Sequence, residues 1–124
     1  MILGLGTDLV EVGRFRLALE RRATLADRLF TDGEREYGFQ QHDPGESLAA
    51  RFAAKEAVMK ALGVGLGDFE FRDVEVLRAD SGVPSLSLTG KARAVADDRG
   101  VVTWMLSLSH TATTAMAVVI AIGA

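Results

Sequence analysis

Residues Glu46 to Gly63 read ESLAARFAAKEAVMKALG and predict one long helix. Up to Leu62 the segment contains neither glycine nor proline, and it is rich in alanine, the residue with the highest helix propensity. Gly63 suits the left-handed position that commonly follows the last helical residue. The glycine-rich loop from Gly63 to Gly67 comes directly afterwards. We therefore expect this helix to be the central element of the fold.

The charged side chains of this helix do not share one face when it is drawn at about 100° per residue. Lys55 falls within the expected core face, which consists of Leu48, Phe52, Met59 and Leu62. Glu56 and Lys60 lie on a second face that otherwise carries alanine. One interpretation is an exposed ion pair between residues four apart, worth roughly a few tenths of a kcal/mol. The alternative is a phosphate-and-metal site, in which the carboxylate holds a hard cation and the lysine holds a phosphate oxygen.

The segments on either side predict further helices and strands. Met1 to Asp8 predicts a buried strand whose glycines allow another backbone to approach closely. The spacing of apolar residues then predicts a helix from Asp8 to about Arg22, and Thr31 with Glu34 forms a capping-box pattern. Four more strands are expected at 74–77, 84–88, 101–109 and 113–122, and a helix at 90–99. Because two hairpins imply antiparallel pairing, the predicted class is α+β, mainly an antiparallel sheet with helices packed on it.

Three other features have both a structural and a functional interpretation. Asp8 is either the N-cap of the helix expected after it or a second carboxylate for a cation shared with Glu56. His110 is either a turn histidine bonded to the backbone or a residue that contacts a phosphate or adenine or acts as acid or base. The basic face of the first expected helix is either solvated or steers an acidic partner, through Arg14, Arg16, Arg21 and Arg22.

The composition excludes several classes of protein. A length of 124 residues predicts a single domain over 1–124, and 48% hydrophobic with 25% charged residues excludes a disordered, collagen-like or coiled-coil chain. The absence of cysteine excludes disulfides and thiolate sites, and a net charge of −3 argues against nucleic-acid binding. The longest apolar stretch, Ala115 to Ile122, is far shorter than the ~20 residues of a membrane helix. Without a visible targeting segment, we expect a cytoplasmic protein.

Three motifs occur in a characteristic order: GLGTDLVE at residues 4–11, ARFAAKEAVMKALG at 50–63 and LSLSH at 106–110. Together they resemble the holo-acyl-carrier-protein synthases, the short bacterial type of 4′-phosphopantetheinyl transferase. The resemblance implies the fold of that family and a homotrimer with sites between neighbouring subunits. It also implies binding of coenzyme A with Mg²⁺ and of apo acyl carrier protein. A serine of the carrier protein then attacks the β-phosphate, phosphopantetheine is transferred and 3′,5′-ADP leaves.

The resemblance also implies roles for individual residues of this chain. Asp8 and Glu56 match the metal-binding carboxylates, and Glu56 also matches the group that helps to deprotonate the serine. Lys60 matches the lysine that contacts the diphosphate. The nucleotide half of coenzyme A is expected at Arg51 and His110, and backbone amides of the loop at Gly63 and Gly65. The carrier protein is expected on the basic helix with Arg14, Arg16, Arg21 and Arg22.

One position departs from the family pattern. A histidine is common shortly before the first serine of the last motif, often after tryptophan, whereas here Trp104 is followed by Met105. We expect this change to affect the packing of the strand or the nucleotide pocket rather than the metal site. Two other functions are weighed against the transferase: a non-catalytic module that binds carrier proteins or nucleotides, and a different metal-assisted enzyme of phosphate esters. The combination of Asp8, Glu56 and Lys60 speaks against a pure binding module.

Overall fold

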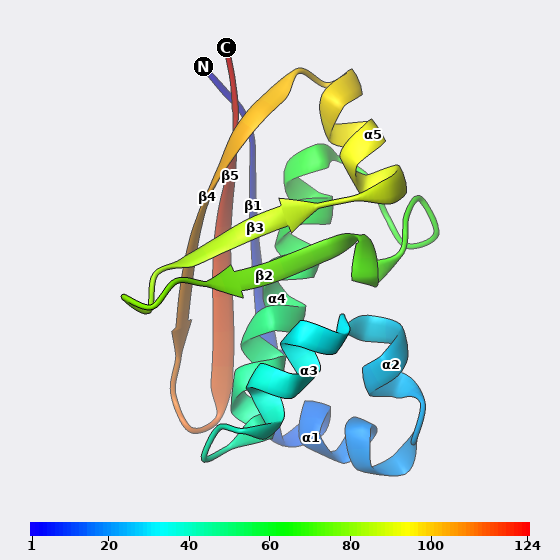
Figure 1. Ribbon diagram of the computed structural model, residues 1–124, viewed down its shortest axis with the longest axis vertical. Coiled ribbons are helices and arrows are strands. Elements are labelled where there is room, and N and C mark those ends of the chain that lie inside the picture. Colours follow the sequence, from blue (N-terminus) through cyan, green and yellow to red (C-terminus); the bar gives the residue numbers. More distant parts are fainter.

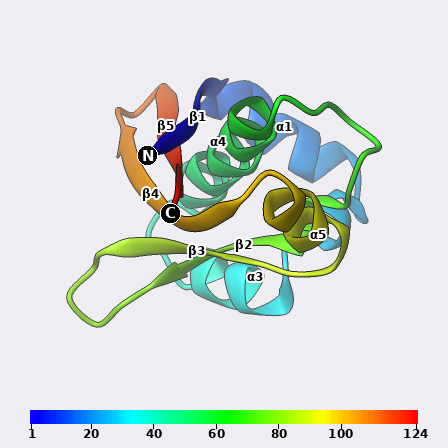
Figure 2. The same cartoon turned by 90° about the horizontal axis from the view of Figure 1, so that it is seen from above.

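The longest helix, α4, lies at the centre of the molecule, and the other elements are arranged around it (Figures 1 and 2). The computed structural model describes residues 1–124. In chain order the elements are β1 (Ile2–Glu11), α1 (Val12–Arg21), α2 (Leu25–Leu29), α3 (Asp32–Phe39), α4 (Pro44–Leu62), a 3₁₀ turn η1 (Phe71–Asp73), β2 (Val74–Arg78), β3 (Pro84–Leu88), α5 (Gly90–Asp98), β4 (Val101–His110) and β5 (Thr114–Gly123). None of the helices is long and apolar enough to cross a bilayer.

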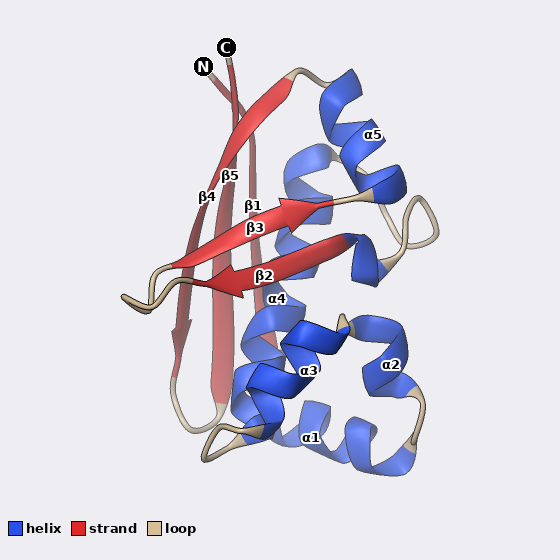
Figure 3. Cartoon of the chain, in the orientation of Figure 1, coloured by secondary structure: helices blue, strands red, loops and turns tan.

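The strands form two antiparallel sheets, which confirms the predicted α+β class. One sheet has the strand order β1-β5-β4, and the other is the β2–β3 hairpin (Figure 3). In the larger sheet the two chain ends lie together, and the Gly123 amide donates a hydrogen bond of 2.8 Å to the Met1 carbonyl (Figure 1). One face of this sheet packs on α4 through small residues of β5, namely Ala115, Ala117, Val119 and Ala121, all of which are buried.

The ends of the helices follow the local signals in the sequence. Gly63 has φ of 70° at the C-cap of α4, the left-handed conformation that glycine adopts most easily. At the other end, Asp43 is the N-cap and its side chain accepts a hydrogen bond from the Glu46 amide. The capping box of Thr31 and Glu34 begins α3 as predicted.

Gly4 and Gly6 let β1 lie directly against α4. A Cβ atom added at Gly4 would lie 2.0 Å from the carbonyl oxygen of Ala61, and one added at Gly6 would lie 1.8 Å from that of Ala57. No larger residue fits at either position without moving the helix or the strand. The predicted close approach is therefore confirmed, and its partner is the alanine face of α4.

The helix predicted to begin at Asp8 begins instead at Val12. β1 continues to Glu11 because it pairs with β5 over its whole length, with Asp8 opposite Ala117 and Glu11 opposite Thr114. Asp8 is therefore a strand residue, and its interpretation as an N-cap is wrong. The pairing partner of β1 lies more than one hundred residues away in the sequence, so local periodicity carries no signal for it.

A buried ion pair joins α4 to α3 and to the hairpin. The Lys55 Nζ donates to Glu34 Oε1 at 2.7 Å, to the Phe71 carbonyl at 3.0 Å and to the Val74 carbonyl. All three donors of this ammonium group are thus used. Burial lowers the pKa of Lys55, and the charge of Glu34 opposes that shift. Lys55 is accordingly a core residue, in agreement with its place on the predicted core face.

The face of the larger sheet that points away from α4 is apolar and open. Leu5, Leu9 and Met105 on this face are more than half exposed. Met105 lies opposite Ile120 of the central strand, and Ile120 lies opposite Leu5. The methionine that departs from the family pattern is therefore part of an exposed apolar surface.

Candidate functional site

Asp8, Glu56 and Lys60 come together where β1 crosses α4. The Lys60 Nζ donates a 2.9 Å hydrogen bond to the Thr7 carbonyl and lies 3.2 Å from Asp8 Oδ1. Two of its three N–H groups are engaged in this way, and the third is available to a phosphate oxygen. Glu56 makes no ion pair with Lys60, so the interpretation of these two residues as an exposed surface pair is not supported.

The two carboxylates of this cluster influence each other electrostatically. Burial raises the pKa of Glu56, the negative charge of Asp8 raises it further, and Lys60 partly opposes the effect. Two carboxylates close together in a partly buried place are unfavourable until a cation neutralises them. Mg²⁺ typically takes one or two protein carboxylates, with waters and substrate phosphates completing its shell. No group of three or more His, Cys, Asp or Glu that could hold a metal ion is present, and two carboxylates alone would leave the rest of a Mg²⁺ shell to waters and substrate phosphates.

The loop after α4 carries the two glycines that the resemblance assigns to coenzyme A. Gly63 and Gly65 are both exposed, and a Cβ at either position would meet no atom within 4 Å. The Gly65 amide donates a 2.9 Å hydrogen bond to Asp68 Oδ2. The Gly63 amide donates to the Lys60 carbonyl at 3.1 Å, so both amides are used within the chain and their contact with coenzyme A stays a prediction.

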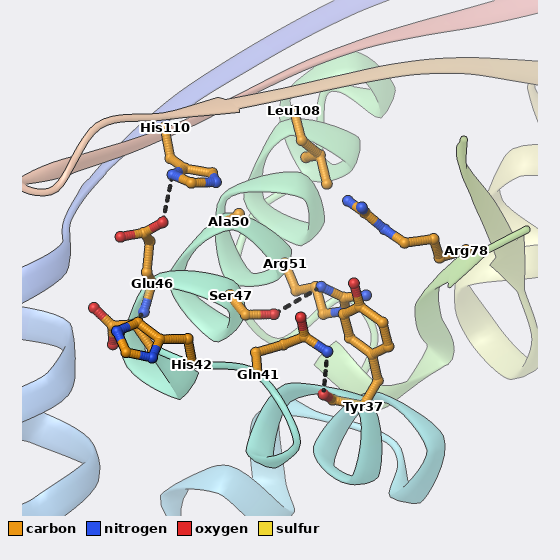
Figure 4. Close-up of a pocket in the computed structure, with 11 residues that line it drawn as sticks. Tyr37, Gln41, His42, Glu46, Ser47, Ala50, Arg51, Arg78, Leu108 and His110 are labelled. Atoms are coloured by element: carbon orange, nitrogen blue, oxygen red, sulfur yellow. Dashed lines mark hydrogen bonds and ion pairs between the residues drawn. The ribbon is translucent and has the colours of Figure 1, made fainter. Parts of the chain in front are cut away.

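A separate cavity of about 390 Å³ lies between α3, the first half of α4 and the end of β4 (Figure 4). It contains Arg51 and His110, the two residues predicted for the nucleotide half of coenzyme A. His110 Nδ1 lies 2.6 Å from Glu46 Oε1, so this ring is oriented by a carboxylate. The interpretation of His110 as a turn histidine bonded to the backbone is therefore wrong. Arg51 Nη1 donates to Ser47 Oγ at 3.1 Å.

Seven further polar residues line this cavity and are not among the predicted site residues: Tyr37, Gln41, His42, Asp43, Glu46, Ser47 and Arg78. The Arg51 guanidinium lies 4.2 Å from the centroid of the Tyr37 ring, and that of Arg78 lies 5.7 Å from it. Tyr37 lies on α3 and Arg78 on β2, and neither belongs to one of the three motifs that resemble the family.

The arginines of α1 divide between two faces. Arg14, Arg21 and Arg22 are exposed and line a shallow depression of about 280 Å³ with Leu17 and Ala18. Arg16 points elsewhere and forms a 2.6 Å ion pair with Asp43, which raises the pKa of Arg16 and lowers that of Asp43. The structure therefore groups three of the four predicted residues on one surface and assigns the fourth to the N-terminus of α4.

The predicted site residues thus form two clusters on α4. The cavity with Arg51 is not lined by Asp8, Glu56 or Lys60. Because five residues turn a helix through about 140° beyond one full turn, Arg51 and Glu56 point to different sides of α4. The first cluster has the groups for a cation and a phosphate, and the second has those for an anionic ligand with a planar base.

Such paired clusters fit a protein that acts on phosphate esters. The family model described as 4′-phosphopantetheinyl transferase superfamily matches residues 4–119 of the chain. The chain belongs to this superfamily, and the resemblance inferred from its three motifs is confirmed.

Proteins of known name are similar to this chain over almost its whole length. A holo-[acyl-carrier-protein] synthase of Beutenbergia cavernae is 50% identical over 121 residues, which cover 98% of this chain and 98% of the relative. The crystal structure of holo-[acyl-carrier-protein] synthase from Neisseria meningitidis has a TM-score of 0.89 at 32% identity, covering 98% of this chain and 99% of that one. A holo-(acyl-carrier-protein) synthase from Bacillus anthracis, in complex with CoA (3′,5′-ADP), has a TM-score of 0.83 at 32% identity and covers 100% and 99%.

Proposed function

We propose that this protein transfers the 4′-phosphopantetheine group of coenzyme A to a serine of apo acyl carrier protein, with Mg²⁺ as cofactor. The observation that carries the proposal is the cluster of Asp8, Glu56 and Lys60 at the crossing of β1 and α4. Similar proteins over the full length are holo-acyl-carrier-protein synthases, and one of them is known in complex with CoA (3′,5′-ADP). The cytoplasmic location is proposed on the sequence alone.

In the proposed reaction the serine oxygen forms a bond to the β-phosphorus and the bond from that phosphorus to the bridging oxygen breaks. Asp8 and Glu56 would hold Mg²⁺, which would supply positive charge to neutralise the diphosphate. Glu56, directly or through a metal-bound water, would help to deprotonate the serine, and the proton would pass to this carboxylate. Lys60 donates its free N–H to a diphosphate oxygen, while its bonds to Thr7 and Asp8 hold the ammonium group in place. The products are holo carrier protein and 3′,5′-ADP.

The carrier protein is proposed to dock on α1. Arg14, Arg21 and Arg22 supply positive charge, and Leu17 between them is 43% exposed and supplies an apolar contact. An acidic helix of a partner matches both features, since charge complementarity steers association. Arg16 is engaged with Asp43, so its contribution is to hold α1 against α4.

A homotrimer with sites between subunits is proposed on two observations. The open face of the larger sheet exposes the large apolar side chains of Leu5, Leu9 and Met105, as surfaces that meet another protein commonly do. The cluster of Asp8, Glu56 and Lys60 (the cation cluster) and the cavity that contains Arg51 (the nucleotide cavity) lie on different sides of α4. A single ligand would reach both most simply if the cluster of one subunit lay beside the cavity of its neighbour. A light-scattering mass of three chains is expected, and a monomeric mass would contradict this part of the proposal.

The transfer itself is tested by incubating the protein with coenzyme A, Mg²⁺ and apo carrier protein. A mass gain of one phosphopantetheine on the carrier protein is expected. Asp8→Ala and Glu56→Ala are expected to abolish the gain while the circular dichroism spectrum stays unchanged. Glu36→Ala, an exposed carboxylate on α3, is the matched control and is expected to be fully active. Full Mg²⁺-dependent transfer by both cluster variants would overturn the site assignment. Nucleotide hydrolysis without any mass gain would support the other metal-assisted enzyme.

A further inference from the structure

The loop after α4 carries backbone amide groups that are open to a ligand. The segment from Gly63 to Asp68 leaves the end of α4 and runs along the outside of the molecule (Figure 2). The amides of Leu66 and Gly67 donate no hydrogen bond within the chain. Gly67 has φ of 93°, and a Cβ at this position would meet no atom within 4 Å. A ligand can therefore approach this stretch of backbone closely.

One side chain of the same loop occupies the amide next to these two. Asp68 Oδ2 accepts the 2.9 Å hydrogen bond from the Gly65 amide, and the Asp68 amide donates one of 3.4 Å to the Gly65 carbonyl. The carboxylate is exposed and forms no ion pair with any cation of the chain. A single exposed hydrogen bond of this kind contributes little to stability, so another acceptor can replace the carboxylate.

The loop is anchored at both ends without help from Asp68. At its start the Gly63 amide donates to the Lys60 carbonyl at 3.1 Å, and the Val64 amide donates to the Met59 carbonyl at 3.0 Å. At its end Phe69 is 5% exposed and belongs to the hydrophobic core. The bond between Asp68 and Gly65 is therefore not needed to keep the loop in place.

The loop adjoins the turn of α4 that carries Lys60, whose third N–H is available to a phosphate oxygen. The nucleotide cavity lies along the first half of α4, away from this loop. The part of coenzyme A expected beside the loop is thus the phosphopantetheine half, on the far side of the diphosphate from the nucleotide. Asp68 adds a negative charge where an anionic substrate is expected, and like charges repel.

We propose that Asp68 is an internal competitor of coenzyme A, whose carboxylate holds the Gly65 amide until an oxygen of the phosphopantetheine half displaces it. The exchange replaces one hydrogen-bond acceptor by another and involves no covalent step. The proposal rests on the proposed function, because it takes coenzyme A as the ligand. Asp68 thereby sets the affinity for the substrate and has no role in the chemical step. Its removal should improve binding, whereas removal of a residue that organises the loop would weaken it.

Titration calorimetry with coenzyme A and with 3′,5′-ADP, both in the presence of Mg²⁺, tests this role. Asp68→Ala is expected to tighten coenzyme A binding at least about threefold, the size expected from one exposed hydrogen bond. Binding of 3′,5′-ADP should not change, because this nucleotide lacks the phosphopantetheine half. Asp68→Asn keeps an acceptor but removes the charge, and its affinity should lie between the two. The control is Asp98→Ala, which removes an exposed carboxylate at the end of α5 and should change neither affinity.

The outcomes separate this proposal from the proposed function. Unchanged or weaker coenzyme A binding by Asp68→Ala would overturn the role of Asp68, and so would an equal gain for both ligands. A wild type that binds neither ligand would overturn it as well. If the wild type transfers nothing but Asp68→Ala gains affinity for coenzyme A alone, the proposed function fails and the role of Asp68 stands. In transfer kinetics Asp68→Ala is expected to lower KM for coenzyme A with little change in kcat.

Discussion

Replacing Gly6 by alanine is expected to disturb both the stability and the activity of this protein. The added Cβ would lie 1.8 Å from the Ala57 carbonyl oxygen, 2.7 Å from its carbon and 2.9 Å from the Ala61 nitrogen. Restoring an ordinary contact of 3.4 Å requires β1 and α4 to separate by about 1.6 Å. The clashing atoms belong to the helix backbone and cannot rotate away. We therefore expect a loss at the upper end of the overpacking range, about 3 kcal/mol of unfolding free energy.

The same displacement acts on the cation cluster, because its contacts cross the interface between β1 and α4. The bonds of Lys60 to Thr7 and Asp8 are 2.9 Å and 3.2 Å long and do not survive a shift of that size. A misplacement of about 1 Å at reacting groups costs roughly a hundredfold in rate. Urea denaturation measures the stability, and phosphopantetheine transfer measures the rate.

Gly13→Ala is the matched control for Gly6→Ala. It lies in α1 and an added Cβ would meet no atom within 4 Å, so neither stability nor activity should fall. If Gly6→Ala keeps its unfolding free energy within about 0.5 kcal/mol of wild type and transfers at full rate, the close approach of strand and helix is not what fixes the cluster.

Two further predictions concern stability. Lys55→Met leaves Glu34 buried without its cation and is expected to cost about 3–5 kcal/mol, part of which Glu34→Gln should restore in the double variant; a loss below about 1 kcal/mol in urea denaturation would contradict the role of this pair. Asp43→Ala removes the N-cap of α4 and is expected to cost about 1 kcal/mol at pH 7. Because the hydrogen bond from Arg16 lowers the pKa of Asp43 in the folded state, this contribution is present above the ordinary carboxyl pKa of about 4 and is lost as the pH falls below it. The difference between wild type and Asp43→Ala should therefore shrink from pH 7 to pH 3, and an unchanged difference would refute the pH dependence.

The parts of the fold that the sequence predicts are those set by local chemistry. The Gly63 cap, the Thr31 capping box and the hairpin turn before Pro84 all lie where predicted, because each depends on neighbouring residues. The end of β1 was misplaced because the residues from Leu9 onward satisfy helical spacing as well as strand alternation. Pairing with β5 makes the residues from Leu9 to Glu11 a strand, and neighbouring residues in the sequence do not show that β5 lies beside them.

The residues of the candidate site also differ in how far the sequence predicts them. Asp8, Glu56 and Lys60 were found because motif spacing and resemblance both pointed to them, and the structure brings them together. Tyr37 and Arg78 were missed, because an aromatic residue in a polar helix and an arginine before a turn look like ordinary surface residues. They become neighbours only when Lys55 and Glu34 hold the hairpin against α3 and α4.

The placement of the two clusters on one helix has a consequence for how substitutions act. In the proposed reaction the cluster of Asp8, Glu56 and Lys60 would contact the diphosphate, where charge changes, so losses there should lower kcat. The cavity that contains Arg51 would contact the nucleotide half of coenzyme A, which does not react, so losses there should raise KM. Both clusters lie on α4, which packs directly against β1 at Gly4 and Gly6, so a side-chain substitution in one cluster is not expected to displace the other. The binding and chemical contributions of this small chain are therefore separable by mutation, although both depend on the same nineteen-residue helix.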